Sequence, residues 1–400
     1  MEKEIFQKAL WIEEPWYIKE IEFKEKEERL DIYLDFRKWS KFKNEEWEEV
    51  WAEQTENRIW KHLFFWQYPT YLHCRVPKVK TKDKKVKIIE VPWARKWSWF
   101  TLLFEWLALE LMKHMPVSKV WEWLKEDDER LMRIAKHYVE KSKKKANYSK
   151  IKRWWIDETS RKKWHNYITT FINFETKKVS CIVEWKWKDT IKDIVEDIEK
   201  HGWKRNNIEE VSIDFSTSFT VWVLEYMPKA NIIYDRFHLM QMIQKALDEV
   251  RRQESISNKL LKWSRYLWLK SDKDLKEKER IELKELKQEN KVLAEAYQMK
   301  ENLKEFFNKE TKEQAELYLK LWCEWVENSG IEAMKKVVKT IKIHWFWIMN
   351  YITKRMNNWV VEWINSIIQT IKRRARWFRN VENFKTMIYL KIWDFEICQV

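Results

Sequence analysis

Two aspartates each follow a short apolar run in the middle of the chain. Asp214 comes directly after residues 211–213 (VSI), and Asp235 comes directly after residues 232–234 (IIY). Short β-branched and aromatic runs of this kind are typical of buried strands. A carboxylate at the end of a core strand is unfavourable unless it binds a metal ion or a partner charge. The pattern therefore predicts part of a metal-dependent active site.

Further carboxylates could complete such a site. Asp157 follows the apolar residues 154–156, and Glu362 lies on a helix expected over residues 360–376. Mg²⁺ takes oxygen ligands, and two divalent cations about 3.5–4 Å apart promote in-line attack on a phosphodiester. Asp157, Asp214 and Glu362 could hold them if the last helix packs against the sheet. Spacing alone does not single out these three, because a chain of 400 residues has many carboxylates.

The elements around these carboxylates alternate between strands and helices. Strands are expected at 154–156, 167–171 and 179–183, a helix over 189–201, and then the two strands before Asp214 and Asp235. Three antiparallel strands, a helix and further strands match the order of a ribonuclease-H-like core. We expect its first part at 149–240 and its remainder, with the Glu362 helix, at 346–400.

A long charged segment separates the two parts of this core. Residues 241–345 have helical patterns and no proline, and residues 272–316 are rich in Lys and Glu. We interpret 241–345 as an all-α insertion; a solvated charged face is the simplest reading of its Lys and Glu residues.

The amino-terminal part of the chain has a different pattern. Residues 1–90 hold short alternating segments that predict a small β-rich module. Helices are expected at 102–114, 117–124 and 128–140, and Pro116 stands at the first junction. This suits a helix-turn-helix within 91–148, although a plain helical bundle fits equally well. The chain is thus expected to be an α+β, multidomain protein.

Composition points to a nucleic-acid partner. The formal net charge is +15, with 36% charged residues, which favours a polyanion over a membrane. An apolar run of about 18 residues and a signal-peptide pattern are both absent from the sequence, so we expect a cytoplasmic, nucleoid-associated protein. The four cysteines are scattered and form no CxxC pair, which disfavours a disulfide framework or a zinc ribbon.

Glycine and tryptophan are present in abnormal numbers. A share of about 7% would give roughly 28 glycines, but the chain has 2, together with 30 tryptophans. Many of these tryptophans stand where a turn favours glycine, as at Trp39, Trp97 and Trp185. We hypothesise that many are UGA codons that the source organism reads as Gly. The alternative is a genuinely Trp-rich protein.

Short motifs along nearly the whole chain resemble one family. They are WKHL (60–63), YLH (71–73), RVP (75–77), VPWAR (91–95), FTLLFE (100–105), MPVS (115–118), IDETS (156–160), HNY (165–167), DRFH (235–238), ALDEVRR (246–252), EWIN (362–365), IKRRARWFR (371–379) and NF (383–384). In this order they resemble the ISL-three group of bacterial insertion-sequence transposases, which carry a DDE triad. The family usually has glycine where this chain has Trp155, Trp164, Trp263, Trp363 and Trp377, which favours the UGA hypothesis independently.

The resemblance implies a function and a site. Asp157, Asp214 and Glu362 would be the catalytic and metal-binding triad, with two Mg²⁺ ions and Mn²⁺ as a possible substitute. The chain would bind terminal inverted repeats, cleave DNA strands and transfer them to target DNA as a dimer or larger assembly. Asp235 and His238 resemble an accessory D-x-x-H element. The alternatives are a helix N-cap for Asp235 and a structural histidine for His238.

Two further features bear on DNA binding. Lys372, Arg373, Arg374, Arg376 and Arg379 follow Glu362 on the same helix and could hold phosphates; a solvated basic helix end is the alternative. The family's amino-terminal module usually carries a cysteine zinc finger, but the corresponding residues 42–46 and 78–86 contain no cysteine. We therefore expect no zinc.

The missing cysteines leave other functions open. An inactive or domesticated DNA-binding remnant of such a transposase would lack strand cleavage. A nuclease on the same fold would cleave without strand transfer.

Overall fold

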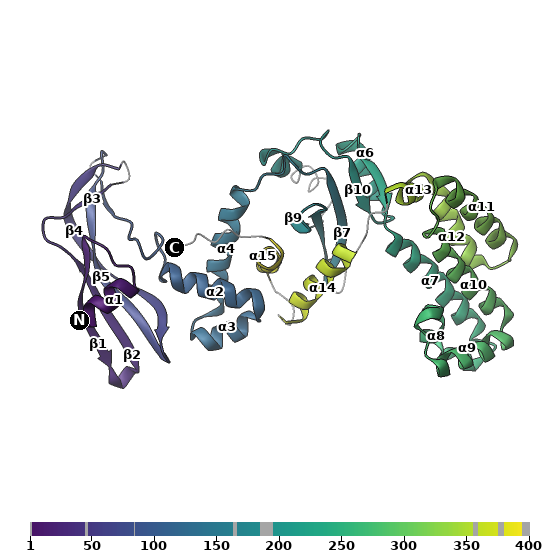
Figure 1. The fold of residues 1–400 in the computed structure, drawn as a ribbon, viewed down its shortest axis with the longest axis horizontal. Helices are drawn as coiled ribbons and strands as arrows, with labels where there is room; N and C mark the ends of the chain where they lie inside the picture. Colours follow the sequence, from purple (N-terminus) through teal and green to yellow (C-terminus); the bar gives the residue numbers. More distant parts are fainter. Residues whose placement is uncertain are drawn as a thin grey trace. The chain divides into compact units, whose positions relative to one another are not determined.

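The computed structural model describes residues 2–44, 47–83, 85–162, 166–184, 195–354, 359–374 and 380–393. The chain forms two compact units, Met1–Lys141 and Ser142–Asp394. Each unit contains one mixed sheet together with helices (Figure 1). The chain is thus a mixed α+β protein of more than one unit, as predicted.

The sheet of the first unit has the strand order β1-β2-β5-β4-β3, with β6 paired to β5. The strands are β1 Trp16–Lys24, β2 Arg29–Phe36, β3 Lys41–Lys43, β4 Glu49–Phe65, β5 Tyr68–Lys80 and β6 Val86–Ile88, preceded by helix α1 Glu2–Ala9. Leu72, Cys74 and Val76 alternate inward along β5 and pack on Ile32 of β2. This period of two is the signal that predicted a β-rich module.

Three helices follow this sheet at the predicted positions. They are α2 Leu102–His114, α3 Val117–Leu124 and α4 Asp128–Lys144. Thr101 caps α2 by accepting a hydrogen bond from the Phe104 N–H, and Pro116 is the N-cap residue of α3. Lys61 of β4 donates to the carbonyls of Leu124 and Lys125 at the end of α3, so the helices are tied to the sheet.

The segments without cysteine face each other in this unit. Asn44 accepts a hydrogen bond from the Glu48 N–H, and its own N–H donates to the Glu48 carbonyl. Lys82, in the opposite turn, lies 3.0 Å from the Glu48 carboxylate and lowers the pKa of that group. Side-chain polar contacts therefore join the two turns.

The sheet of the second unit has the order β11-β10-β7-β8-β9. The strands are β7 Arg153–Lys162, β8 Asn166–Asn173, β9 Lys178–Glu184, β10 Glu210–Ile213 and β11 Asn231–Tyr234. β7, β8 and β9 pair antiparallel, whereas β10 is parallel to both β7 and β11. All four residues of β10 are buried, which explains its continuous apolar run. Residues 195–200 of the predicted 189–201 helix are helical, and residues 189–194 lie outside the described residues.

Helices from distant parts of the chain complete this unit. Helix α6 Thr217–Tyr226 connects β10 to β11, α14 Trp359–Arg374 contacts β7, and α15 Val381–Ile392 contacts β9. Figure 1 shows α14 and α15 beside these strands. Val361, Ile364, Ile368 and Ile371 are buried along one face of α14. That apolar stripe holds the helix on the sheet, as its sequence pattern predicts.

The described elements between β11 and α14 are helical. They include α7 Arg236–Glu254, α8 Arg265–Leu269, α9 Glu277–Glu289, α10 Lys291–Phe306, α11 Lys312–Asn328, α12 Glu332–Ile343 and α13 Trp345–Lys354. Their buried side chains belong to the same apolar cluster as the sheet. Asn350 of α13 also donates a hydrogen bond to the Ile232 carbonyl of β11, at 2.9 Å.

The first strand of this core is longer than its apolar run. The sequence pattern placed Asp157 on that strand, directly after residues 154–156; β7 continues to Lys162, and Asp157 pairs with Thr170 in its middle. The strand continues because residues 158–160 pair with β8 and Thr159 is buried. Asp214 and Asp235 do follow the last residues of β10 and β11.

The structure describes three of the four cysteines. Cys74, Cys181 and Cys323 are free and buried, while Cys398 lies outside the described residues. Within the described part of the chain, none of the helices has the length and apolar character needed to cross a membrane.

Candidate functional site

A cleft of about 580 Å³ opens between β7, the start of α7 and the face of α14. It is lined by Asp157, Glu158, Thr159, Asp235, Phe237, His238, Gln241, Val361, Glu362, Asn365 and Gln369. Four of the residues predicted from the sequence are in this set: Asp157, Glu362, Asp235 and His238. The tertiary fold thus gathers groups from three distant segments.

The carboxylate of Asp157 is held from α14. It is buried in the middle of β7, and its Oδ2 accepts a hydrogen bond of 2.5 Å from the Asn365 side-chain amide, 208 residues away in sequence. The same Asn365 accepts from the Thr159 hydroxyl at 3.0 Å. Because the two contacts use opposite ends of the amide, they fix both its orientation and that of the Asp157 carboxylate.

Asp235 is both a helix cap and a lining residue of the cleft. Its Oδ1 accepts from the Phe237 N–H at 2.6 Å, which makes it the N-cap of α7. Burial raises its pKa to about 6, and the nearby charges of Asp157 and Glu362 add to this effect. The N-cap role considered from the sequence is therefore present, together with a perturbed carboxyl group.

His238 stands one turn into α7 and faces two carboxylates. Its Nε2 lies 3.8 Å from Asp157 Oδ1 and 3.9 Å from Asp235 Oδ2. Burial lowers the pKa of His238, but Asp157 and Asp235 outweigh burial, so the pKa is above its ordinary value. The two acids thus favour the imidazolium form of His238.

Glu362 and Asp214 have different environments. Glu362 is exposed in the first turn of α14, and it lines the cleft. Asp214 is not among the residues that line it; its Oδ1 accepts from the Ser216 N–H at 2.9 Å. Burial raises the pKa of Asp214, and the charges of His238 and Asp157 act on the same group. Asp214 is therefore within electrostatic range of the cleft without forming its wall.

Comparison with known proteins places this cleft in a family. A family model described as a transposase matches residues 155–388, which include all the elements around the cleft. The chain belongs to the ISL3 family of transposases. A second model, the helix-turn-helix domain of transposase family ISL3, matches residues 89–139 and so covers α2, α3 and most of α4. This match confirms the prediction of a helix-turn-helix and disfavours the alternative of a plain helical bundle.

Individual relatives agree with this family. The chain is similar to the transposase for insertion sequence element IS1001 of Bordetella parapertussis, at 29% identity over 63% of this chain and 62% of that protein. It is also similar to the transposase for insertion sequence element IS1557 of two Mycobacterium tuberculosis strains, at 23% identity over 81% of this chain and 79% of theirs. The chain thus spans less than two thirds of the IS1001 protein's length.

Sequence reasoning missed two members of the site. Asn365 lies three residues after Glu362, a spacing that puts both on one face of a helix. Glu158 lines the cleft, and its pKa is raised by burial and by the charges of Asp214 and Asp157. The helical spacing could have identified Asn365, whereas only the fold brings Glu158 close to Asp214.

The described basic residues after Glu362 are not among the residues that line the cleft. Lys372, Arg373 and Arg374 form the last turn of α14, and none of these three lines the cleft. Arg376 and Arg379 lie outside the described residues. The three described cations are therefore near a helix C-terminus, where positive charge is favourable whether or not DNA is bound.

The donor chemistry of the cleft suits a hard divalent cation. Asp157, Asp235, Glu158 and Glu362 offer carboxylate oxygens, the donors that Mg²⁺ and Mn²⁺ prefer. Within the described ranges, no three His, Cys, Asp or Glu side chains are close enough together to hold a metal ion. The residues thus match such an ion in chemical type, and their spacing is wider than that of a closed metal centre.

Proposed function

We propose that this chain is the transposase of an insertion sequence, which binds terminal inverted repeats, cleaves DNA strands there and transfers the freed ends to target DNA. The observation that carries the proposal is the meeting of Asp157 and Glu362 in one cleft, inside the segment that matches the ISL3 transposase model. The relatives described above are transposases for insertion sequence elements IS1001 and IS1557.

The order of the second sheet supports a ribonuclease-H-like core. Three antiparallel strands, β7 to β9, are followed by β10 and β11 on the other side of β7. In this proposal the core comprises 149–240 and 346–400, with 241–345 as the insertion. Residues 1–90 form the amino-terminal module, and 91–148 form the helix-turn-helix region that reads the repeats.

Asp157, Asp214 and Glu362 are proposed as the catalytic triad and as the residues that hold two divalent cations, Mg²⁺ or Mn²⁺. Such cations, when bound, activate a hydroxyl nucleophile and stabilise the leaving oxygen. Asn365 orients the Asp157 carboxylate through its 2.5 Å hydrogen bond, and His238 offsets part of the negative charge of Asp157 and Asp235. The side chains thus act through positioning and charge, with no covalent enzyme intermediate.

DNA binding is assigned to two regions. The helix-turn-helix helices would contact the repeats, and the cations Lys372, Arg373, Arg374, Arg376 and Arg379 would hold phosphates near the cleft. Two DNA ends must be joined in one event, so we propose a dimer or larger assembly. The working location is the nucleoid in the cytoplasm, where the DNA substrate is found.

Strand cleavage and joining by the full chain test this proposal. The substrate is a labelled duplex taken from the DNA that flanks the gene, with Mg²⁺ or Mn²⁺ present. Asp157→Ala, Asp214→Ala and Glu362→Ala should each abolish cleavage while leaving duplex binding unchanged. Cleavage that survives one of these substitutions removes that residue from the triad. Asp274→Ala, which changes an exposed carboxylate in the 241–345 insertion, is the matched control.

The same assay separates the two other functions. A DNA-binding remnant would bind the flanking duplex without cutting it under any metal condition. A nuclease would release cut strands without joined products. Inverted repeats on both sides of the gene would favour the transposase over both.

A further inference from the structure

Tryptophan occupies most of the left-handed backbone positions of this chain. Among the described residues, eight non-glycine residues have positive φ, and five of them are Trp11, Trp39, Trp47, Trp66 and Trp97, with φ from 50° to 68°. Tryptophan makes up 30 of the 400 residues, so an even distribution would place fewer than one at such positions. A Cβ atom is unfavourable there, and glycine is the residue that adopts this conformation freely.

Trp11 stands at the glycine position of a helix terminus. After α1, the Ile12 N–H donates to the Gln7 carbonyl at 2.9 Å, and the Trp11 N–H donates to the Lys8 carbonyl at 3.1 Å. This pair of bonds is the Schellman motif, with Trp11 at the C′ residue. That position is left-handed, and glycine usually fills it. The backbone around Trp11, with φ of 50°, is therefore built for glycine.

Trp66 stands at the glycine position of a tight hairpin. β4 ends at Phe65 and β5 begins at Tyr68, and these two residues pair across a two-residue loop. Trp66 is the first loop residue and has φ of 60°, whereas Gln67 is not among the positive-φ residues. A two-residue hairpin loop with positive φ at its first position is of the II′ kind, which has glycine there.

The other three stand in turns that connect strands or loops. Trp97 is the third residue of the turn that closes with the Ser98 N–H on the Arg95 carbonyl, at 3.1 Å. Positive φ at the third position is the demand of a type II turn, and glycine meets it. Trp39 has the same place between Arg37 and Ser40, and Trp47 follows Asn44 in the loop before β4.

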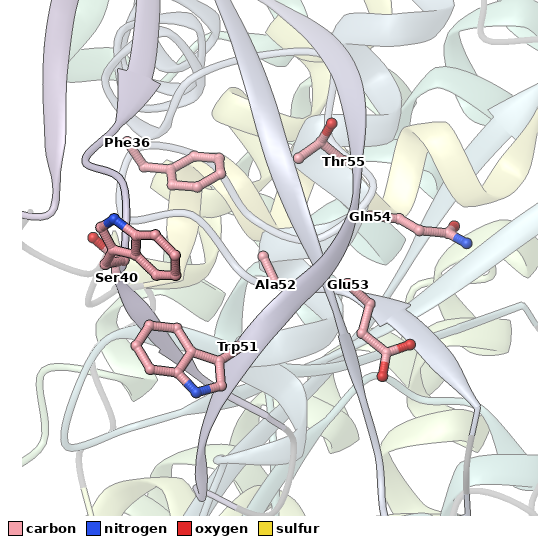
Figure 2. A pocket seen from close by; sticks show the side chains of 8 residues that line it. Phe36, Ser40, Trp51, Ala52, Glu53, Gln54 and Thr55 are labelled. Carbon is pink, nitrogen blue, oxygen red and sulfur yellow. The ribbon is translucent and has the colours of Figure 1, made fainter.

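These side chains are also poorly placed for tryptophan. All five are 62% to 86% exposed, although tryptophan is normally largely buried. Trp39 is one of the residues that line an open hollow on the first unit. Phe36 and Trp51 line the same hollow (Figure 2). If residue 39 is glycine, the hollow loses one of its aromatic walls and becomes more open. We therefore assign no binding role to this hollow.

We infer that positions 11, 39, 47, 66 and 97 are glycine positions, and that the gene encodes them by UGA codons that the source organism translates as glycine. Turn geometry at the five sites carries this inference, independently of the composition and of the proposed transposase activity. Trp60 and Trp93 are expected to be true tryptophans. They are buried and pack on each other, with ring centroids 5.8 Å apart.

Codons and peptide masses test the inference directly. We expect UGA at all five positions and UGG at Trp60 and Trp93. We also expect peptides of the protein isolated from its own cells to have the mass of glycine at the five positions. UGG codons at these positions, or peptides with the mass of tryptophan there, would overturn the inference.

Stability provides a test that does not depend on the source organism. Trp97→Gly in the full chain should raise the melting temperature of the first unit in calorimetry, because it relieves a strained φ. The matched control is Trp99→Gly, two residues further on and 70% exposed, which is outside the set of positive-φ residues. It should leave the melting temperature unchanged or lower it. If Trp97→Gly lowers the melting temperature as much as Trp99→Gly, position 97 does not require glycine.

Discussion

His238 Nε2 lies 3.8 Å from Oδ1 of Asp157, so a side chain at the start of α7 faces a carboxylate in the middle of β7. Asp235, the N-cap of the same helix, is 3.9 Å from the same nitrogen. Two acids therefore share one imidazole at the floor of the cleft. This arrangement makes the stability of the second unit sensitive to pH.

Asp235→Asn should flatten part of that pH dependence. The folded pKa of Asp235 is about 6, against an ordinary value of 3.8. The folded state therefore holds the proton more tightly, so the contribution of Asp235 to stability is present below pH 4 and is lost as pH rises to about 6. Denaturant titrations at pH 4 and pH 7 should show a loss of order 1–3 kcal/mol that the variant lacks. If the wild type and Asp235→Asn lose the same unfolding free energy between pH 4 and pH 7, Asp235 is not the group responsible.

His238→Gln should remove a separate component at higher pH. The pKa of His238 is raised above 6.5, so its contribution is complete below pH 6.5 and disappears as pH rises through the folded value. The unfolding free energy of the wild type should fall as the pH rises above 6.5, and that of the variant should fall less. His201→Gln is the control, because the Nδ1 of His201 contacts a backbone carbonyl, that of Asp197.

Asn365→Ala should reduce strand cleavage by roughly 10–100-fold, as is usual when a group that orients a catalytic ligand is removed. Asn365→Asp would replace the amide that donates to Asp157 by a second negative charge, and should reduce cleavage at least as much as Asn365→Ala. Gln369→Ala changes the next turn of α14 in the same cleft and serves as control.

A stability cycle tests the Asn365 contact without any activity. Asn365→Ala and Asp157→Ala should be non-additive in unfolding free energy, because the two side chains share a hydrogen bond. Additive losses would mean that the bond contributes nothing, even if cleavage fell. A wild type that fails to cleave would instead count against the proposed function alone.

Lys61→Ala should destabilise the first unit strongly. The Lys61 ammonium is buried, 3.1 Å from the buried Glu126 carboxylate, and donates to two carbonyls at the end of α3. Removing one partner of a buried pair costs about 3–5 kcal/mol, because the other charge stays buried. Lys119→Ala breaks an exposed pair with Glu122 and should change the unfolding free energy by less than about 1 kcal/mol. Similar losses of unfolding free energy in Lys61→Ala and Lys119→Ala would show that burial does not strengthen the Lys61 contacts.

Replacing Lys372, Arg373 and Arg374 together by Ala should weaken duplex binding uniformly across sequences. If these cations contact phosphates, the slope of log affinity against log salt becomes shallower by about 0.9 for each lost contact. An unchanged slope would mean that these cations do not contact phosphates and only stabilise the C-terminal end of α14. Replacement of Lys278, Lys284 and Lys287 on α9, which is far along the chain from the cleft segments, provides the control of equal charge.

The local patterns of the sequence predicted the elements well. The alternation in β2 and β5, the three helices around Pro116 and the apolar stripe of α14 all depend on residues within one or two turns of each other. Asp214 and Asp235 could be placed after strands for the same reason. The apolar run at 154–156 indicated only the first part of β7, because the extension of the strand to Lys162 depends on its pairing with β8.

The sequence by itself determined the elements, the basic character and the family resemblance, because these depend on local patterns and residue types. Only the tertiary structure decided that Asp157, Asp235, His238 and Glu362 share a cleft whose lining omits Asp214. It also decided that Asn365 binds Asp157 across 208 residues, since such convergence depends on how α14 packs on the sheet. The backbone likewise decided which tryptophans occupy positive-φ positions that favour glycine, because the geometry of the turn sets φ at these positions.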